Sequence, residues 1–402
     1  MKLLILSCST GEGHNSAGKA LLEYLEENGV ACEMTDTLSL VTSPVSQMVS
    51  DVYLFSTRRN LFKTVYRMGE TVSTGLSLQS PVYMANKLYA KRLYDYIVDN
   101  GFDTVVCTHL FPAEALTALK RAGRLDRKTV FVMTDYTCIP FTRETDLDYY
   151  IVPHEHLVEE CVQKGLRRER LFPFGIPVRR AFRERIAKRE ARVACAAAFD
   201  SGADMTAKWF LVASGSMGFG SSADLIREIL SRCGKGAEVF MVCGNNAKLQ
   251  TVLKAEFGRF DNIHLLGFTD RMSLLMDACD VLFTKPGGLS STEAAVKNIP
   301  IVHTAPIPGC ETRNAEFFHY HGMSYSSLEV KQQVTVAMTM RTGSVCATVS
   351  ERTPTEMRVA GYLNCYADKR YIRRIQGGRT AVRPPCQSQM VKTTPAVIQR
   401  GG

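Results

Sequence analysis

Long apolar runs and closely spaced cysteines are both missing from this 402-residue sequence. No window approaches the ~18 apolar residues that a membrane-spanning helix needs, which argues against a helical integral membrane protein. The apolar residues 3–8 run into a glycine-rich turn and are too few for a secretory signal, so we interpret them as a buried strand. The thirteen cysteines are dispersed without a CxxC pattern, which argues against a zinc site or a disulfide framework and favours a reducing cytosol.

Excess positive charge is also missing from most of the chain, although the formal net charge is +9. Residues 330–402 contain twelve basic and three acidic side chains, and the remaining 37 of each sign balance. A nucleic-acid-binding protein would carry basic residues on its folded domains, so we expect no nucleic acid partner.

What the sequence does contain is a series of short apolar runs separated by helix-length segments. The length favours two domains, because a single core rarely grows beyond about 250–300 residues. Runs that are apolar on both faces and alternate with helices predict α/β domains with parallel sheets. The expected strands cover residues 3–8, 30–34, 104–108, 129–134, 148–153, 209–214, 237–243, 263–267, 281–284 and 300–303.

A charged and then alanine-rich stretch divides the two strand series. We take residues 1–176 as the first domain, 177–207 as the linker and 208–329 as the second domain. Long periodic runs disappear in residues 330–402, which predicts a mostly disordered basic tail in which 331–340 could hold a short element.

Four loops follow strands at the ends where open α/β sheets bind ligands. They comprise residues 10–16, 214–220, 285–294 and 305–314. Glycines allow the backbone to approach a phosphate closely, and the N–H groups at the start of a following helix favour an anion. His14 would stand at such a helix start, where the helix dipole disfavours the protonated imidazole and so favours a general base.

Each loop also has a purely structural interpretation. His14 could cap an ordinary strand-to-helix turn, and Glu293 could reach back to Ser290 in a capping box. Glu311 and Asn314 could simply stabilise the N-terminus of their helix. Taken one at a time, these residues do not separate the two interpretations.

Taken together, the motifs resemble the glycosyltransferases of family 28, most closely the processive diacylglycerol glucosyltransferases and the monogalactosyldiacylglycerol synthases. The resemblance covers about residues 2–325 and rests on TGEGHNSA, VMTDYT, FGIPV, CGNN, LGF, KPGGLSSTEA and PIPGCETRNAEFF, in this order. It implies a GT-B fold, in which two Rossmann-like domains face each other across a cleft. It also implies a UDP-hexose donor and diacylglycerol or another lipid as acceptor.

The resemblance further implies roles for the matching residues. In the second domain, uracil would bind near Phe268, the ribose at Glu293, and the hexose at Glu311 and Asn314. In the first domain, the acceptor hydroxyl would lie beside His14 and Asp135. The complete expected UDP-sugar site comprises Gly13, Ser214, Gly215, Ser216, Met217, Gly244, Asn245, Phe268, Gly287, Gly288, Thr292, Glu293, Glu311 and Asn314.

The expected reaction is a one-step inverting transfer. His14 would act as the base, with Asp135 as the second candidate or as the partner that orients His14. Helix N-termini and glycine-loop amides would stabilise the charge on the diphosphate, and without an Asp-x-Asp motif we expect no metal and no cofactor. Many relatives carry Gln where Cys310 stands, so the donor is open: UDP-glucose first, UDP-galactose second, UDP-N-acetylglucosamine as a further option.

A basic amphipathic segment, residues 57–92, carries seven cations and one acid. Apolar residues at helical spacing between cations are typical of helices that lie on anionic lipid, although a helix packed on its own domain shows the same pattern. With a lipid acceptor implied, we expect a cytoplasmic protein attached peripherally to the inner face of the cell membrane. The residues expected to bind the membrane are Arg58, Arg59, Phe62, Lys63, Tyr66 and Arg67.

Other functions remain open at this point. The nearest is an N-acetylglucosaminyltransferase acting on a polyprenyl-linked acceptor, and others are a UDP-N-acetylglucosamine 2-epimerase and a non-catalytic UDP-sugar-binding protein. The basic tail could reflect an altered reading frame near Ser327 or an extension that binds lipid headgroups.

Overall fold

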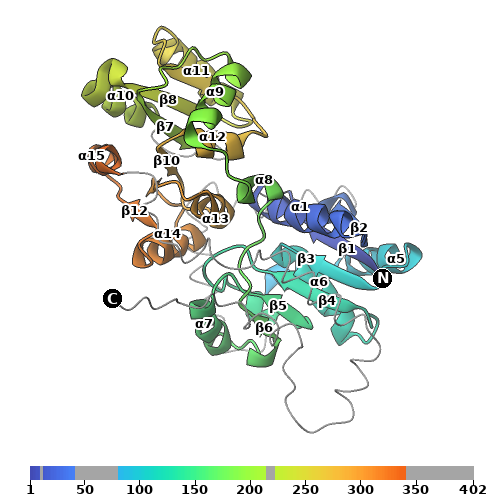
Figure 1. Ribbon diagram of the computed structural model, residues 1–402. Coiled ribbons are helices and arrows are strands. Elements are labelled where there is room, and N and C mark those ends of the chain that lie inside the picture. The colour runs from blue at the N-terminus through green and yellow to red at the C-terminus, as the bar shows by residue number, and fades with distance from the viewer. Residues whose placement is uncertain (10–11, 41–79, 214–221, 341–402) are drawn as a thin grey trace, which may run out of the picture.

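The computed structural model describes residues 1–9, 12–40, 80–213 and 222–340, which form two α/β domains (Figure 1). The sheet of the first domain has six parallel strands in the order β2 (Ala31–Asp36), β1 (Lys2–Ser7), β3 (Thr104–Cys107), β4 (Lys128–Val132), β5 (Tyr149–Ile151) and β6 (Leu171–Phe172). Its helices are α1 (Glu12–Glu27), α4 (Pro81–Lys87), α5 (Ala90–Asp99), α6 (Leu110–Arg121) and α7 (Val158–Gln163). Short 3₁₀ turns lie at η1 (Thr37–Leu40), η2 (Thr142–Glu144), η3 (Glu155–Leu157) and η4 (Arg168–Arg170).

The second sheet is also parallel and six-stranded. Its order is β12 (Ser324–Ser326), β11 (Ile301–His303), β10 (Val281–Thr284), β7 (Lys208–Ala213), β8 (Ala237–Val242) and β9 (Ile263–Leu266). The accompanying helices are α8 (Arg180–Arg183), α9 (Lys188–Phe199), α10 (Ser222–Cys233), α11 (Ala247–Phe257), α12 (Met272–Ala278), α13 (Gly288–Lys297), α14 (Cys310–Tyr320) and α15 (Val330–Thr339), with η5 at Gly234–Gly236. The predicted α/β class is confirmed.

Burial explains why the apolar runs form parallel strands. Leu3, Leu4, Ile5 and Leu6 of β1 are all fully buried. Successive side chains of a strand point to opposite faces, so both faces of this sheet are covered. The ten expected strands are all present, with ends shifted by at most two residues. The sequence missed β6, which has only two residues, and β12, whose sequence Ser-Tyr-Ser is not an apolar run.

The predicted linker is wrong in its second half, because residues 188–199 form helix α9 of the second domain. α9 packs on α12, and its Ala191 and Cys195 are fully buried. The buried guanidinium of Arg192 donates to Asp280 at 2.7 Å and to the carbonyl of Ala207 at 3.1 Å. The chain passes between the domains at α8, which contacts α1 on one side and α13 on the other.

The short element expected at 331–340 is present as α15, but it belongs to the second domain and not to a disordered tail. This helix packs on α10 and β12, with Val334 and Ala337 fully buried. Lys208 Nζ lies 2.8 Å from the carbonyl oxygens of Ala337 and Met338, where a cation stabilises a helix C-terminus. The second domain therefore extends past residue 329, while residues 341–402 lie outside the described part of the chain.

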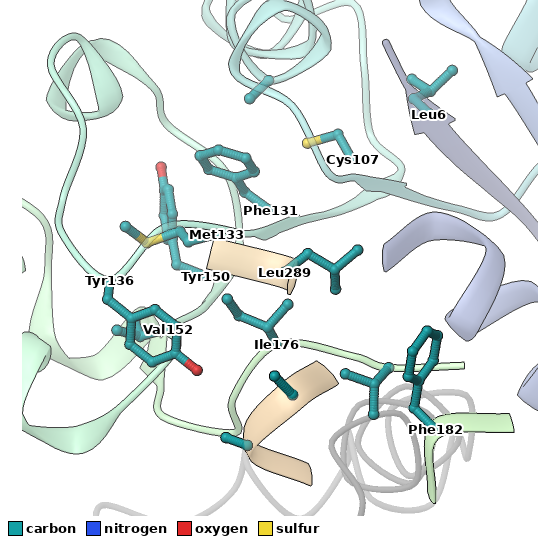
Figure 2. Packing of buried hydrophobic residues seen from close by; sticks show 14 of the residues in the cluster. Leu6, Cys107, Phe131, Met133, Tyr136, Tyr150, Val152, Ile176, Phe182 and Leu289 are labelled. Carbon is teal, nitrogen blue, oxygen red and sulfur yellow. The ribbon is translucent and has the colours of Figure 1, made fainter. Parts of the chain in front are cut away.

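The two domains share apolar packing. Leu289, in the first turn of α13, belongs to the same buried cluster as first-domain residues. Figure 2 shows Leu289 among side chains such as Phe131 and Ile176. The start of α13 is thereby held against the first domain. No helix of the described residues is long and apolar enough to cross a bilayer.

Candidate active site

The carboxyl ends of β1, β3 and β4 meet the start of α13. A Cβ atom on Gly13, in the first turn of α1, would lie 3.7 Å from the Cβ of Leu289. A Cβ on Gly288 would lie 2.0 Å from the carbonyl oxygen of Thr134, so only glycine fits there. Loops from both domains therefore form one site, as parallel sheets with facing carboxyl edges predict.

His14 stands at the start of α1 with its ring orientation fixed. Its Nδ1 lies 2.8 Å from the carbonyl oxygen of Thr108 and 3.0 Å from the hydroxyl of Thr134. A carbonyl oxygen only accepts, so Nδ1 donates the proton and Nε2 keeps its lone pair. Burial lowers the pKa of His14, and the negative charge of Asp135 opposes this shift without reversing it. The imidazole is therefore neutral near pH 7 and can accept a proton at Nε2.

Asp135 follows β4, as expected, but it is not the group that orients His14. That position is taken by the carbonyl of Thr108, because the parallel pairing of β1 with β3 brings residue 108 beside the start of α1. Asp135 acts on His14 through its charge, and its Oδ1 accepts a hydrogen bond of 2.9 Å from Asn314. The predicted orienting role of Asp135 is thus corrected.

His109 is part of this site and was missed from the sequence. Its ring meets that of His14 edge-on, with centroids 4.5 Å apart. Its Nδ1 accepts the backbone N–H of Phe111 at 3.1 Å and caps α6. Burial, and then the neighbouring His14, lower the pKa of His109 well below its usual value. The sequence signal that could have indicated His109 is its position just after the strand at 104–107. Asp135 was selected as a candidate because it has the same kind of position after its own strand.

Glu293 is buried in the second turn of α13 and makes no hydrogen bond within the described residues. Burial raises its pKa to about 8, while the charge of Arg179 opposes the shift. The capping box with Ser290 is absent, because the helix begins at Gly287 and Gly288 without a side-chain cap. A buried carboxyl group without a partner is costly, so this position favours a bound ligand with hydroxyl donors.

Asn314 joins the two domains. Its Oδ1 accepts the backbone N–H of Tyr136 at 2.6 Å, and its Nδ2 donates to Asp135 and to the carbonyl of Pro286 at 3.0 Å. Both amide N–H groups are used, so the expected contact with the hexose would require Asn314 to exchange partners. No local pattern indicates this role, since Tyr136 lies 178 residues away in the chain.

Thr292 and Glu311 also bond to protein groups. The hydroxyl of Thr292 donates to the carbonyl of Gly288 at 2.7 Å and lies 2.8 Å from the Tyr136 hydroxyl. The carboxylate of Glu311 pairs with Lys285 at 2.6 Å. These contacts fix the start of α13 and α14, so the two residues shape the site, and their predicted contact with the donor stays a prediction.

The remaining expected donor residues lie at the carboxyl ends of neighbouring strands. Gly244 follows β8 with a φ of 59°, which favours glycine, and Asn245 is exposed. Phe268 follows β9 and is 66% exposed, which is unusual for a phenylalanine and suits a stacked base. A Cβ on Gly287 would meet nothing within 4 Å, so the backbone there borders open space. The expected donor residues Ser214, Gly215, Ser216 and Met217 lie outside the described residues.

Two family models match the chain in its two domains. Residues 14–178 match monogalactosyldiacylglycerol (MGDG) synthase, and residues 210–335 match the C-terminal domain of glycosyltransferase family 28. A processive diacylglycerol beta-glucosyltransferase of Staphylococcus saprophyticus is 27% identical over 333 residues, which cover 80% of both chains. The protein of the same name in Bacillus pumilus is 26% identical over 325 residues, which cover 80% of this chain and 82% of that one.

Solved structures share the fold at low sequence identity. MurG of Acinetobacter baumannii has a TM-score of 0.55 and 13% identity, over 90% of this chain and 98% of its own. Staphylococcus aureus MnaA, solved with UDP, has a TM-score of 0.59 and 11% identity, over 92% and 97%. The spinosyn rhamnosyltransferase SpnG has a TM-score of 0.56 and 11% identity, over 90% and 100%. The GT-B fold expected from the sequence motifs is confirmed.

Proposed function

Because the chain belongs to the glycosyltransferases of family 28, we propose that it transfers a hexose from a UDP-sugar to diacylglycerol and so makes a glycolipid. The curated relatives named above are diacylglycerol glucosyltransferases, which favours glucose over galactose. The observation that carries the proposal is the placement of two groups on opposite sides of the domain contact. A neutral imidazole, His14, lies on one side, and the buried carboxyl group of Glu293, which makes no hydrogen bond to the described residues, lies on the other.

The donor would bind along the carboxyl edge of the second sheet. Glu293 would accept hydrogen bonds from the ribose hydroxyls, and the exposed ring of Phe268 would lie at the base. The first N–H groups of α13 border open space at Gly287 and have no side-chain cap, so they are available to a diphosphate. The predicted contribution of residues 214–217 belongs to the same proposal.

The transfer would proceed in one step with inversion. Nε2 of His14 removes the proton of the acceptor hydroxyl, whose oxygen then bonds to the anomeric carbon. The bond from that carbon to the diphosphate oxygen breaks at the same time, and its electron pair leaves with UDP. The growing negative charge on the diphosphate is stabilised by the start of α13. The Thr108 carbonyl holds the proton on Nδ1 and keeps Nε2 ready as the base.

The lipid acceptor requires access to a membrane surface. The expected membrane-binding residues Arg58, Arg59, Phe62, Lys63, Tyr66 and Arg67 lie outside the described residues. The described end of the same basic segment is α4 and the start of α5, where Met84 is 50% and Leu88 63% exposed. Exposed Lys87, Lys91 and Arg92 accompany them. Apolar groups among cations suit peripheral attachment to an anionic bilayer.

The test is incubation of the protein with diacylglycerol micelles and radiolabelled UDP-glucose, UDP-galactose or UDP-N-acetylglucosamine. We expect labelled glycolipid, with a rate that falls about 10²–10⁴-fold in His14→Ala. His319→Ala is the control, because His319 is exposed on α14 and contacts none of these groups. Release of labelled free sugar would favour an epimerase, and tight UDP binding without product would favour a binding protein.

A further inference from the structure

A second group of chemistry-bearing side chains lies outside the candidate active site. His154 and His156 follow β5 in the first domain, and His321 follows α14 in the second. One ring nitrogen from each lies within 4.8 Å of the other two. Within the described part of the chain, this is the only group of His, Cys, Asp or Glu side chains with the geometry of a metal site.

The distances suit a tetrahedral transition metal. Nδ1 of His156 lies 3.2 Å from Nε2 of His321. A Zn²⁺ ion bound at 2.0–2.1 Å by two imidazoles separates their nitrogens by about 3.3 Å. These two rings therefore already have the required spacing, and the third must move closer by about 1.5 Å at most, within the reach of a χ rotation.

The surroundings of the rings favour this arrangement. Nδ1 of His154 accepts the backbone N–H of His156 at 3.2 Å, which orients the His154 ring. The ring of Phe317 packs against both His154 and His321, with centroids 5.2 and 4.3 Å apart. His156 is exposed, so an ion can enter from solvent. Imidazoles without carboxylates select Zn²⁺, Ni²⁺ or Cu²⁺ rather than Mg²⁺ or Ca²⁺.

We propose that His154, His156 and His321 bind one transition-metal ion such as Zn²⁺, and that this ion links the two domains. Water would occupy the fourth position. The ion would stabilise the contact between the domains, because its ligands come from both of them. Phe317 extends the same contact by stacking on Tyr136, with ring centroids 4.5 Å apart. Tyr136 is the residue whose N–H binds Asn314. This role is separate from the transfer reaction and does not depend on the proposed function.

To test the proposal, Zn²⁺ is titrated into the full chain after treatment with EDTA, and its binding is measured by calorimetry. We expect one Zn²⁺ per chain and a higher melting temperature with the ion bound. His321→Gln should weaken binding at least tenfold and remove the thermal effect. His319→Gln is the matched control, since His319 is exposed on α14 and lies outside the group; it should bind like the original chain.

An equal Zn²⁺ affinity in the original chain and in His321→Gln would overturn the proposal. If His154→Gln/His156→Gln loses binding in that case, the ion lies on the first domain alone. X-ray absorption of the Zn²⁺-loaded original chain needs no variant: three imidazole ligands support the proposal, and fewer than three contradict it.

Discussion

The carbonyl oxygen of Thr134 lies 2.0 Å from the point that a Cβ atom on Gly288 would occupy. The contact joins the loop that follows β4 in the first domain to the first residue of α13 in the second. Both partners are backbone, so neither can rotate away as a side chain would. Gly288 therefore sets how closely α13 approaches the residues around His14.

Gly288→Ala should separate the two domains. The added methyl group cannot fit, so α13 must move away from Thr134, at a cost of about 1–3 kcal/mol in the free energy of unfolding. Chemical denaturation measures this loss, and small-angle scattering should show a larger radius of gyration. Gly236→Ala is the control, because a Cβ there meets nothing within 4 Å and its φ is not positive. Equal effects of the two substitutions would contradict the prediction.

UDP binding should release a proton from Glu293 near pH 7. With a pKa of about 8, the free carboxyl group is mostly protonated at that pH. Ribose hydroxyls that donate to the carboxylate favour its ionised form and lower the pKa. Calorimetry in two buffers of different ionisation enthalpy measures the proton release. Glu293→Gln should abolish it and weaken UDP binding about 10–100-fold, and proton release that persists in this variant would exclude Glu293 as its source.

Glu293 should also make the free energy of unfolding fall as the pH rises. The folded state holds the Glu293 proton up to about pH 8, whereas the ordinary value is 4.5, so the folded state binds more protons between these limits. Unfolding without UDP should therefore become easier from pH 4.5 to 8, and each pKa unit corresponds to about 1.4 kcal/mol. In Glu293→Gln this part of the pH dependence should disappear. An identical slope in both proteins would contradict the raised pKa.

The sequence predicted the strands well because each buried strand leaves a local apolar signal. Residues 3–6, 105–106 and 281–283 are fully buried, and all were expected strands. The two-residue β6 leaves no such signal, since its register depends on β5 beside it. The alanine-rich residues 188–199 looked like a linker because their burial depends on α12, which lies far away in the sequence.

The candidate site was only partly predictable for the same reason. His14 could be found because a glycine-rich turn and a helix start surround it in the sequence. His109 meets His14 only through the parallel pairing of β1 and β3, in which Leu6 lies opposite Cys107. The bonds from Asn314 to Asp135 and Tyr136 span the two domains, and no local pattern shows how domains meet.

The pH dependence of kcat/KM should identify the base. Burial lowers the pKa of His14 below 6.5, so the acidic limb should lie below that pH if His14 is the base. Asp135 raises the pKa of His14, so Asp135→Asn should move the limb to lower pH while activity persists. If Asp135 were the base, the same substitution would lower kcat by about 10²–10⁴-fold. The two candidates thus give opposite results in one experiment.

Reversing the charge of Lys87 and replacing the apolar Leu88, at the C-terminal end of α4, should weaken membrane binding. Leu88→Asp/Lys87→Glu removes an exposed apolar side chain and changes the local charge by three units, and each basic residue near an anionic surface contributes about 1 kcal/mol. Flotation with anionic vesicles should show binding at least tenfold weaker, and the loss should shrink as salt rises because salt screens the surface potential. Val252→Asp/Lys248→Glu makes the same changes on α11 of the second domain, where both side chains are also exposed. If the first domain carries the contact, this control binds vesicles normally, and equal losses in the two variants would mean that total charge, not this surface, determines attachment.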